Sequence, residues 1–298
     1  MKVMSEGPEV KIIADKISHL LKGKEIEDII FKNLDSHIKN KIIGSELEYI
    51  KPFGKNLVFK FSSGIFLRNH MMMWGKWRIY DRSKYDKGLA IPPPRRSKLK
   101  NLHSLSTIKK EKDVRNDSRV RLTIITKETV LIEFNGPILQ FSTDNPAEKD
   151  PIKSLGPDCL NQQIFDKEEI KKRLLIHSKQ KELLIADALL NQKIIAGIGN
   201  KYKSEILFIC KINPFKQISQ LDSIQQNHLF EEIPKLLKYG YENAGRTRPL
   251  LTGEQNSWNT RHWVFRRAGK ECWICKTKIM SEKKLTARST FWCPYCQQ

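Results

Sequence analysis

The hydrophobic positions near the start of the chain repeat with the period of an α-helix. Five apolar residues of this segment recur at helical spacing: Val10, Ile13, Ile17, Leu20 and Leu21. Pro8 suits the first turn of a helix, where a missing N–H is tolerated, and Glu9 suits the positive end of the helix dipole. The pattern therefore predicts a helix that begins near residue 8, with Ser5–Glu6–Gly7 at its mouth.

From about residue 25 to residue 80, short apolar runs separated by turn residues predict β-strands. The runs read IEDIIFK, ELEYIKPF, NLVFKFSSGIFLR and WRIYD. The sequences FGKN at 53–56 and SSG at 62–64 predict hairpin turns. Strands resume after residue 118 with RVRLTIIT and ETVLIEF. The first half of the chain is therefore expected to be mostly β, with one helix at its start.

Residues 82–118 interrupt these strands and are rich in Pro, Lys, Arg and Ser, with PPPRRSKLK at 92–100. This composition predicts an inserted, mobile basic loop. A nuclear localisation patch and an additional DNA-contacting loop are alternative interpretations of the same residues.

The second half of the chain follows a linker at 142–152 and is predicted to be helical. The helical segments read KEEIKKRLLIH, ELLIADALLNQ and KYKSEILFICKI, and a longer one covers about 222–240. The glycine-containing turn IAGIGN lies between two of them, at 195–200. The last forty residues are expected to form a cysteine-bearing hairpin.

The excess of positive charge indicates what kind of partner the protein binds. The 298 residues include 54 Lys and Arg but 33 Asp and Glu, so the formal charge is +21. A hydrophobic fraction of 39% indicates a folded chain, and the length suggests roughly two domains of about 150 residues. No apolar run is long enough for a membrane helix, and the N-terminus lacks the apolar region of a secretory signal. We therefore expect an intracellular protein that binds a polyanion, with nucleic acid favoured over ribosomal or membrane-surface binding.

Four of the six cysteines form two C-x2-C pairs separated by 17 residues, a spacing typical of a four-cysteine zinc site. The predicted ligands are Cys272, Cys275, Cys293 and Cys296. Because protein fills all four positions, one zinc ion would be structural rather than catalytic. Two unrelated turns or a redox pair are the alternatives, and Cys159 and Cys210 are expected to be buried apolar residues.

Several short motifs occur in an order that resembles a known family. They are SEGPE at 5–9, FGK at 53–55, NHMMMWGKW at 69–77, GPD at 156–158, AGIGN at 196–200 and FWCPYCQ at 291–297. In this order the chain resembles the formamidopyrimidine-DNA glycosylase/endonuclease VIII family, and its endonuclease VIII branch most closely. The similarity spans nearly the whole chain apart from the insertion at 82–118.

This resemblance implies an α+β fold with two domains. An N-terminal β-sandwich with a leading helix would cover 1–145, and a helix–two-turns–helix domain would cover 146–256. The second domain would end in a zinc-finger β-hairpin at 257–298. The implied enzyme is a monomer that binds damaged DNA and flips out an oxidised base, by likeness a pyrimidine. It then cuts the glycosidic bond and nicks the strand by β,δ-elimination.

The same resemblance implies three catalytic residues. The family uses the amine of an N-terminal proline as its nucleophile, whereas this chain has Ser5 preceded by Met1–Met4. A free α-amine at Ser5 could form a Schiff base if translation starts at Met4 or the leader is cleaved. Glu6 would be the general acid and base, although an acidic residue at a helix start can simply complement the dipole. Lys55 would contact phosphate beside the lesion, unless it is a solvated turn lysine.

Because the nucleophile differs from proline, two other functions stay open. One is a catalytically silent DNA-binding zinc protein that kept the scaffold. The other is a monofunctional glycosylase in which Glu6 activates water.

The DNA-binding residues implied by the resemblance lie in three places. Met72, Met73 and Trp74 would fill the gap left by the flipped base, or else form a buried strand. Gly199 and Asn200 would bring backbone N–H groups and an amide to a phosphate, or else form a plain helix–helix turn. Arg288 would bind a flanking phosphate from the zinc hairpin. His70 is assigned no chemistry.

Overall fold

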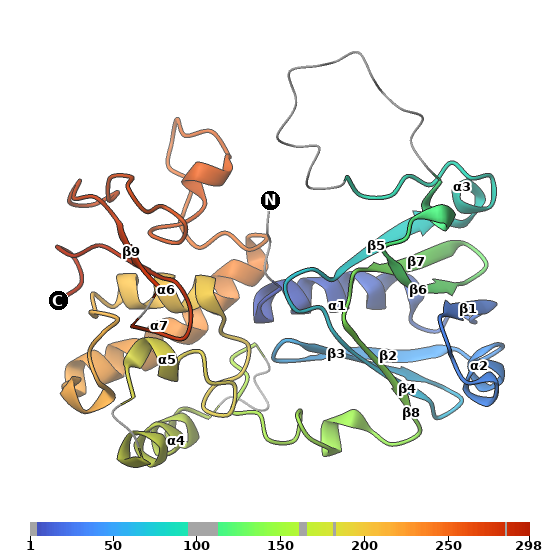
Figure 1. Cartoon of the computed structure of the whole chain (residues 1–298), viewed down its shortest axis with the longest axis horizontal. Coiled ribbons are helices and arrows are strands. Elements are labelled where there is room, and N and C mark those ends of the chain that lie inside the picture. The colour runs from blue at the N-terminus through green and yellow to red at the C-terminus, as the bar shows by residue number, and fades with distance from the viewer. Residues whose placement is uncertain (1–4, 95–112, 161–165, 181–182, 284) are drawn as a thin grey trace. The chain divides into compact units, whose positions relative to one another are not determined.

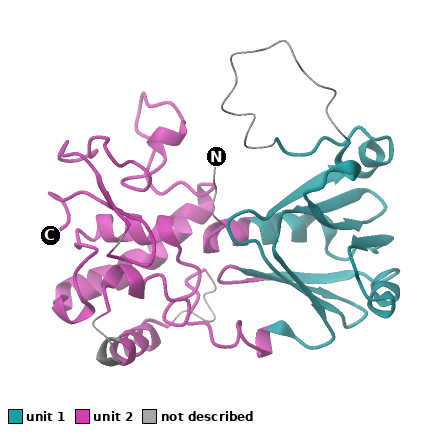
Figure 2. Ribbon diagram, viewed as in Figure 1, with its two compact units in different colours: residues 1–4, 13–51, 56–146 teal, residues 5–12, 52–55, 147–298 magenta. Residues whose placement is uncertain are grey.

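The computed structural model describes residues 5–94, 113–160, 166–180, 183–283 and 285–298. They cluster into two compact units, which Figure 2 distinguishes by colour. The first unit comprises 13–51 and 56–146, and the second comprises 5–12, 52–55 and 147–298. Helix α1 (Gly7–Leu21) begins in the second unit and continues into the first. Two short pieces that are distant in sequence, 5–12 and 52–55, therefore belong with the helical half of the chain.

The first unit is a sandwich of two antiparallel four-stranded sheets (Figure 1). One sheet has the order β1 (Asp28–Phe31), β6 (Val120–Ile125), β7 (Thr129–Phe134) and β5 (Lys76–Asp81). The other has the order β2 (Leu47–Phe53), β3 (Asn56–Phe61), β4 (Phe66–His70) and β8 (Ile138–Ser142). Aromatic rings join the two sheets, with centroids 5.3 Å apart for Phe59 and Trp77 and 5.5 Å apart for Phe31 and Phe141. The predicted strands and both hairpin turns are confirmed.

The insertion at 82–118 differs from the predicted loop at both of its ends. Residues Arg82–Asp86 form helix α3, and Val114–Asn116 form the 3-10 turn η2. Tyr85, Ala90 and Val114 are buried in one cluster with strands β6 and β7, because these apolar side chains cover a sheet face. The expectation of a mobile loop is therefore wrong for these flanks, and residues 95–112 lie outside the described residues. Helix α2 (Ser36–Ile42) and strand β8 were not predicted either.

The second unit is built around a buried helix, α6 (Asn200–Ile209). The other helices are α4 (Lys167–Gln180), α5 (Ile185–Ala188) and α7 (Ser223–Glu242), with 3-10 turns at Pro146–Glu148, Ile218–Gln220 and Trp258–Thr260. All residues of α6 from Asn200 to Phe208 are buried, and Tyr202, Ile206 and Leu207 share one core with α4, α5 and α7. The helix predicted over 182–192 is only one turn long, because residues 189–195 form turns instead.

The chain ends in a small antiparallel hairpin of β9 (Met280–Glu282) and β10 (Thr290–Trp292). Phe208 of α6 packs on it in a cluster with Val264, Ile279 and two cysteines. Among the described residues, none of the helices is both long and apolar enough to cross a membrane.

Candidate active site at the start of helix α6

Three segments of the second unit meet at the turn that precedes α6. The Gly7 N–H donates to the Gly197 carbonyl at 2.8 Å. A Cβ on Gly54, in the β2–β3 turn, would lie 3.2 Å from the Ala196 Cβ and 3.3 Å from the Gly197 nitrogen. The Gly54 N–H in turn donates to Asp158 Oδ2 at 2.8 Å. Close approach of three backbones therefore brings the predicted residues Ser5, Glu6 and Lys55 to the same turn.

The Glu6 carboxylate occupies the N-terminus of α6. Its Oε2 accepts the Gly199 N–H at 3.0 Å and the Tyr202 N–H at 3.1 Å, and its Oε1 accepts the Lys201 N–H at 2.9 Å. Only 1% of Glu6 is exposed. These are the unpaired donors and the positive dipole end that every helix N-terminus offers to an anion. The expectation that these N–H groups are free for a phosphate is therefore wrong, because the chain supplies its own anion.

Position 199 requires glycine because the Glu6 carboxyl occupies the adjacent space. Its backbone is extended, with φ −123° and ψ −165°, so its conformation does not require glycine. A Cβ there would lie 2.4 Å from the Glu6 Cδ, far inside contact distance. Gly199 leaves room for the Glu6 carboxyl rather than for a phosphate.

The protonation of Glu6 is set by opposing effects. Burial raises the pKa of Glu6 above its ordinary value, whereas the charges of Lys201 and then Lys55 lower it and Glu9 raises it further. Burial also lowers the pKa of the Lys55 ammonium, with Glu6 opposing that change and Arg288 adding to it. Lys55 is therefore coupled electrostatically to both Glu6 and Arg288. A buried carboxyl and an amine with shifted pKa values in one place are the pattern of an acid–base site.

Glu9 and Lys201 form a buried ion pair behind Glu6. Lys201 Nζ is paired with Glu9 Oε1, and Glu9 Oε2 accepts the Glu6 N–H at 3.2 Å. From the sequence, Glu9 is expected to complement the helix dipole and to support the geometry of the site, whereas Lys201 carries no prediction. One signal was available, since Lys201, Lys203 and Glu205 fall within a helix otherwise rich in apolar residues.

The predicted DNA-binding residue Asn200 contacts the zinc hairpin. Its Nδ2 donates to the Ser289 carbonyl at 2.7 Å, which commits one of its two amide hydrogens. Two more bonds hold the same stretch: Ala287 N to Asp187 Oδ1 at 2.9 Å, and Lys203 Nζ to Thr290 Oγ1 at 2.8 Å. The exposed side chain of Arg288 therefore projects from a backbone that is fixed to α5 and α6 on both sides.

Two buried charges of α6 that sequence analysis missed support this hairpin. Burial lowers the pKa of Lys203 to about 8, with Asp187 and Glu6 opposing the change. Glu205 accepts the backbone N–H groups of three consecutive residues at 2.7–2.8 Å: Trp263, Val264 and Phe265. Helix α6 thus fixes Glu6 at its start and the cysteine-bearing segment along its length.

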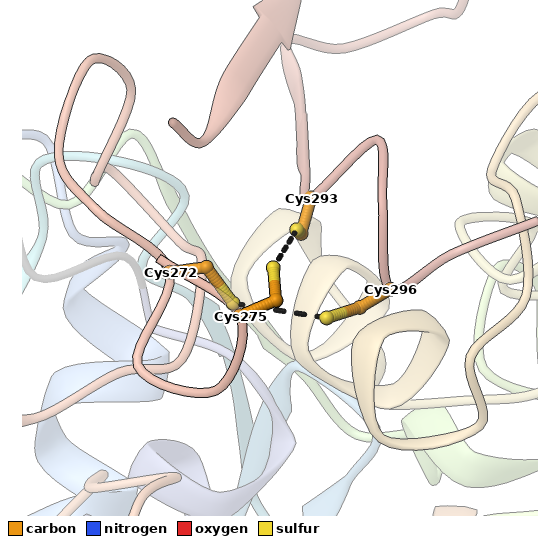
Figure 3. A group of neighbouring side chains, drawn as sticks. All are labelled: Cys272, Cys275, Cys293 and Cys296. Carbon is orange, nitrogen blue, oxygen red and sulfur yellow. Dashed lines mark hydrogen bonds between the residues drawn. The ribbon is translucent and has the colours of Figure 1, made fainter. Parts of the chain in front are cut away.

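The four cysteines of the two C-x2-C pairs come together, as Figure 3 shows. Their sulfur atoms all lie within 4.8 Å of one another, with Cys272 to Cys296 at 3.9 Å and Cys275 to Cys293 at 3.4 Å. Four thiolates about 2.3 Å from a tetrahedral zinc ion would be about 3.8 Å apart. The observed spacing fits one such metal ion. Cys159 and Cys210 are buried, as predicted.

The apolar run at 71–74 belongs to the first unit. Met71 is 1% exposed, whereas Met72 and Trp74 are each 46% exposed, and Met73 is intermediate. Met72 has a left-handed backbone (φ 50°), and its N–H donates to His70 Nδ1 at 3.1 Å. The run is therefore not a buried strand, and it presents two large apolar side chains to solvent. His70 thus accepts a backbone hydrogen bond from the same run.

Two models of one protein family match the chain. The family model of the formamidopyrimidine-DNA glycosylase N-terminal domain matches residues 4–131, and that of the formamidopyrimidine-DNA glycosylase H2TH domain matches residues 155–249. Endonuclease 8 of Salmonella arizonae is 27% identical over 297 residues, which are 99% of this chain and 100% of that protein. Endonuclease 8 of Salmonella agona is 26% identical over the same shares.

Solved structures match the fold at similar coverage. The complex of Lactococcus lactis Fpg with DNA containing an abasic site gives a TM-score of 0.75 at 22% identity, covering 98% of this chain and 99% of that one. The Lactococcus lactis complex with Fapy-dG-containing DNA gives 0.74 at 22% identity and the same coverage. The two family models together include the Glu6 segment and the helix that holds it.

Proposed function

The chain belongs to the formamidopyrimidine-DNA glycosylase family, and we propose that it is a base-excision-repair glycosylase with AP-lyase activity. Its substrates would be oxidised bases in DNA, with pyrimidines favoured by likeness to the endonuclease VIII branch. The observation that carries the proposal is the Glu6 carboxyl, buried at the start of α6 directly after Ser5 and electrostatically coupled to Lys55.

The nucleophile in this proposal is the α-amine of Ser5. An α-amine with a pKa of about 7.7–8.0 is substantially neutral at cellular pH, whereas an ordinary lysine near 10.4 is not. The amine is free only if Met4 is the translated start and is removed, or if the leader is cleaved. The N-terminal family model begins its match at residue 4, which supports that register. Residues 1–4, on which the leader hypothesis depends, lie outside the described residues.

The proposed reaction begins with attack of the Ser5 amine on the sugar and ends with two eliminations that cut the strand. The Ser5 nitrogen forms a bond to C1′ of the deoxyribose, and the bond from C1′ to the base breaks with the electron pair leaving on the base. The departing base takes up the proton that the Ser5 nitrogen releases. Glu6 gives a proton to O4′ as the sugar ring opens, which yields an iminium ion. The Glu6 carboxylate then takes a C2′ proton, and the C3′–O bond breaks. A second elimination transfers the C4′ proton to water as the C5′–O bond breaks with its electron pair leaving on the phosphate. Water then hydrolyses the imine and returns the free amine.

The remaining residues would bind DNA or support the site. Lys55 and Arg288 would contact phosphates beside the extruded nucleotide, since both are cationic and electrostatically coupled to the site. Met72, Met73 and Trp74 would fill the gap in the base stack. Gly199 would act through Glu6, and Asn200 would act through Ser289 and through a phosphate contact of its side-chain amide. One zinc ion on the four cysteines would hold the hairpin that carries Arg288.

Borohydride trapping tests this function. Protein beginning at Ser5, reacted with an abasic-site oligonucleotide and reduced, should give a covalent adduct that maps to Ser5. A matched protein with an uncleavable extension before Ser5 should give none. On a duplex that carries an oxidised pyrimidine, release of free base without nicking would instead favour the monofunctional glycosylase. Damage-selective binding alone would favour the catalytically silent protein. Full strand cleavage by the extended protein would rule out the Ser5 amine.

A further inference from the structure

The ion pair behind Glu6 lies in a space shaped to hold it. Lys201 is 6% exposed and Glu9 is 9% exposed. Lys201 Nζ also donates to the Gly245 carbonyl at 3.1 Å and lies 4.2 Å from the centroid of the Tyr202 ring. A Cβ on Gly245 would lie 2.4 Å from Glu9 Oε1 and 3.3 Å from Lys201 Nζ. Gly245 therefore leaves room for the pair, which joins α1, α6 and the segment that follows α7.

The pair contacts Glu6 from two sides. The Lys201 backbone N–H donates to Glu6 Oε1 at 2.9 Å, while the Lys201 side chain is paired with Glu9. Glu9 Oε2 accepts the Glu6 backbone N–H at 3.2 Å, which closes a ring of contacts through both residues. Charges this deeply buried act on one another far more strongly than charges in water. The positive member favours an ionised Glu6, and the negative member favours a protonated one.

We propose that the buried Glu9–Lys201 pair is a positioning and tuning device that sets the protonation state of Glu6, and with it the pH range in which the site works. The inference rests on the proposed function, in which Glu6 both gives and takes a proton. The charged and titratable groups that act on Glu6 or respond to it come from three elements: Glu9 on α1, Lys55 on the β2–β3 turn, and Lys201, Tyr202 and Lys203 on α6. Glu9 and Lys201 alone among these form an ion pair with each other and also contact Glu6.

The test uses the opposite signs of the two charges. In zinc-loaded protein that begins at Ser5 and is labelled with ¹³C at glutamate carboxyls, the Glu6 signal is the one that Glu6→Gln removes. Lys201→Met should move the Glu6 titration to higher pH by roughly one unit, since a nearby charge changes a carboxyl pKa by one unit or more. Glu9→Gln should move it to lower pH, and the double variant should return it close to the parent protein.

Two controls separate charge from structure. Lys201→Arg keeps the charge and should titrate like the parent. Lys238→Met removes a lysine from the exposed pair with Glu242 and should leave the Glu6 titration unchanged. If Lys201→Met does not fold, Glu9→Gln carries the test alone. Shifts of both single variants in one direction, or no shift in a folded Glu9→Gln protein, would overturn the inference.

Cleavage of an abasic-site oligonucleotide in single turnover then links the titration to function. The acid limb of the pH–rate profile for this cleavage should move in the same direction as the Glu6 titration in each variant. Opposite NMR shifts in a protein that never cleaves abasic DNA would support the tuning of Glu6 and contradict the proposed function instead. An acid limb that stays fixed while the Glu6 signal moves would overturn the inference for catalysis.

Discussion

Gly199 and Glu6 are fitted to each other at the start of helix α6. The Gly199 N–H donates to Glu6 Oε2 at 3.0 Å, and the place of a Gly199 Cβ is only 2.4 Å from the Glu6 Cδ. The two residues are separated by almost two hundred positions in sequence. The helix therefore holds the proposed acid–base group only while position 199 has no side chain.

The first prediction concerns this fit. Gly199→Ala should displace the Glu6 carboxyl and lower the single-turnover rate on abasic DNA by about 100-fold or more, since general acid–base catalysis contributes about that much. Binding to an uncleavable abasic analogue should change far less. Gly253→Asn is the control, because Gly253 has a left-handed backbone that asparagine tolerates and no atom within 4 Å of its Cβ position. A fully active Gly199→Ala protein would contradict the role given to this contact.

A second prediction concerns Glu133, which is fully buried in the first unit. Its Oε2 accepts the Gly136 N–H at 2.8 Å, and its Oε1 lies 2.8 Å from the place of a Cβ on Gly75, at the end of the loop that carries Met72 and Trp74. Burial raises the pKa of Glu133 from 4.5 to about 7, with the N–H groups of Gly136 and Lys76 opposing the change. A buried carboxyl with a raised pKa stabilises the fold below pH 4.5, and this contribution is lost as pH rises to about 7.

Glu133→Gln should therefore remove a pH dependence. The difference between pKa values of 4.5 and about 7 corresponds to at most about 3 kcal/mol of unfolding free energy. Urea unfolding at pH 5 and pH 8 should show the parent losing stability relative to Glu133→Gln as pH rises. Parallel stability curves for the two proteins would show that Glu133 has an ordinary pKa.

A third prediction distinguishes Arg288 from Asn200 by the salt dependence of DNA binding, since both residues are proposed to serve phosphate binding. Arg288→Ala removes a charge, so it should reduce the slope of log K against log salt by about one and weaken binding to all DNA sequences alike. Asn200→Ala removes the bond to Ser289 but no charge, so it should weaken binding without changing the slope. Equal slopes for Arg288→Ala and the parent would exclude a phosphate contact by Arg288. A changed base preference in either variant would point to base readout instead.

The fourth prediction is that removal of the metal affects only one part of the protein. Two cysteines of the cluster are buried with Phe208, Val264 and Ile279, so an unliganded hairpin should lose this packing. Chelation should abolish DNA binding and activity while the strand signal in circular dichroism persists. Cys210 is a buried thiol outside the cluster, so the Cys210→Ser protein should keep the metal. The Cys293→Ser protein should lose it. Unchanged activity after complete loss of the metal would contradict this dependence.

The fifth prediction tests the exposed apolar side chains. Trp74→Ala should slow excision from duplex DNA by about 10-fold or more, because unstacking a base step costs a few kcal/mol that an inserted ring offsets. Excision of the same base from a single strand should change little. Ile30→Ala is the matched control, an exposed apolar residue of the same unit. Equal losses on both substrates would exclude a wedge.

The sequence by itself determined most of the helices and strands and the grouping of the four cysteines. The α1 helix, the strands and the paired cysteines follow from local periodicity, turn residues and fixed spacing, which need no knowledge of distant contacts. The order of the motifs was enough to indicate one family, to which both the SEGPE segment and the AGIGN turn belong. Helix α2 had a local signal that was overlooked, since Asp35 caps it by accepting the N–H groups of His37 and Ile38.

Only the tertiary structure decided which group fills the start of α6. A glycine turn before a helix can bind any anion, and the resemblance implied a phosphate there. No local signal points to a glutamate almost two hundred residues away. The structure also placed Lys201 against Glu9 and Asn200 against Ser289. Such contacts depend on how segments distant in sequence pack, because a buried charge must find whatever partner the fold brings near it.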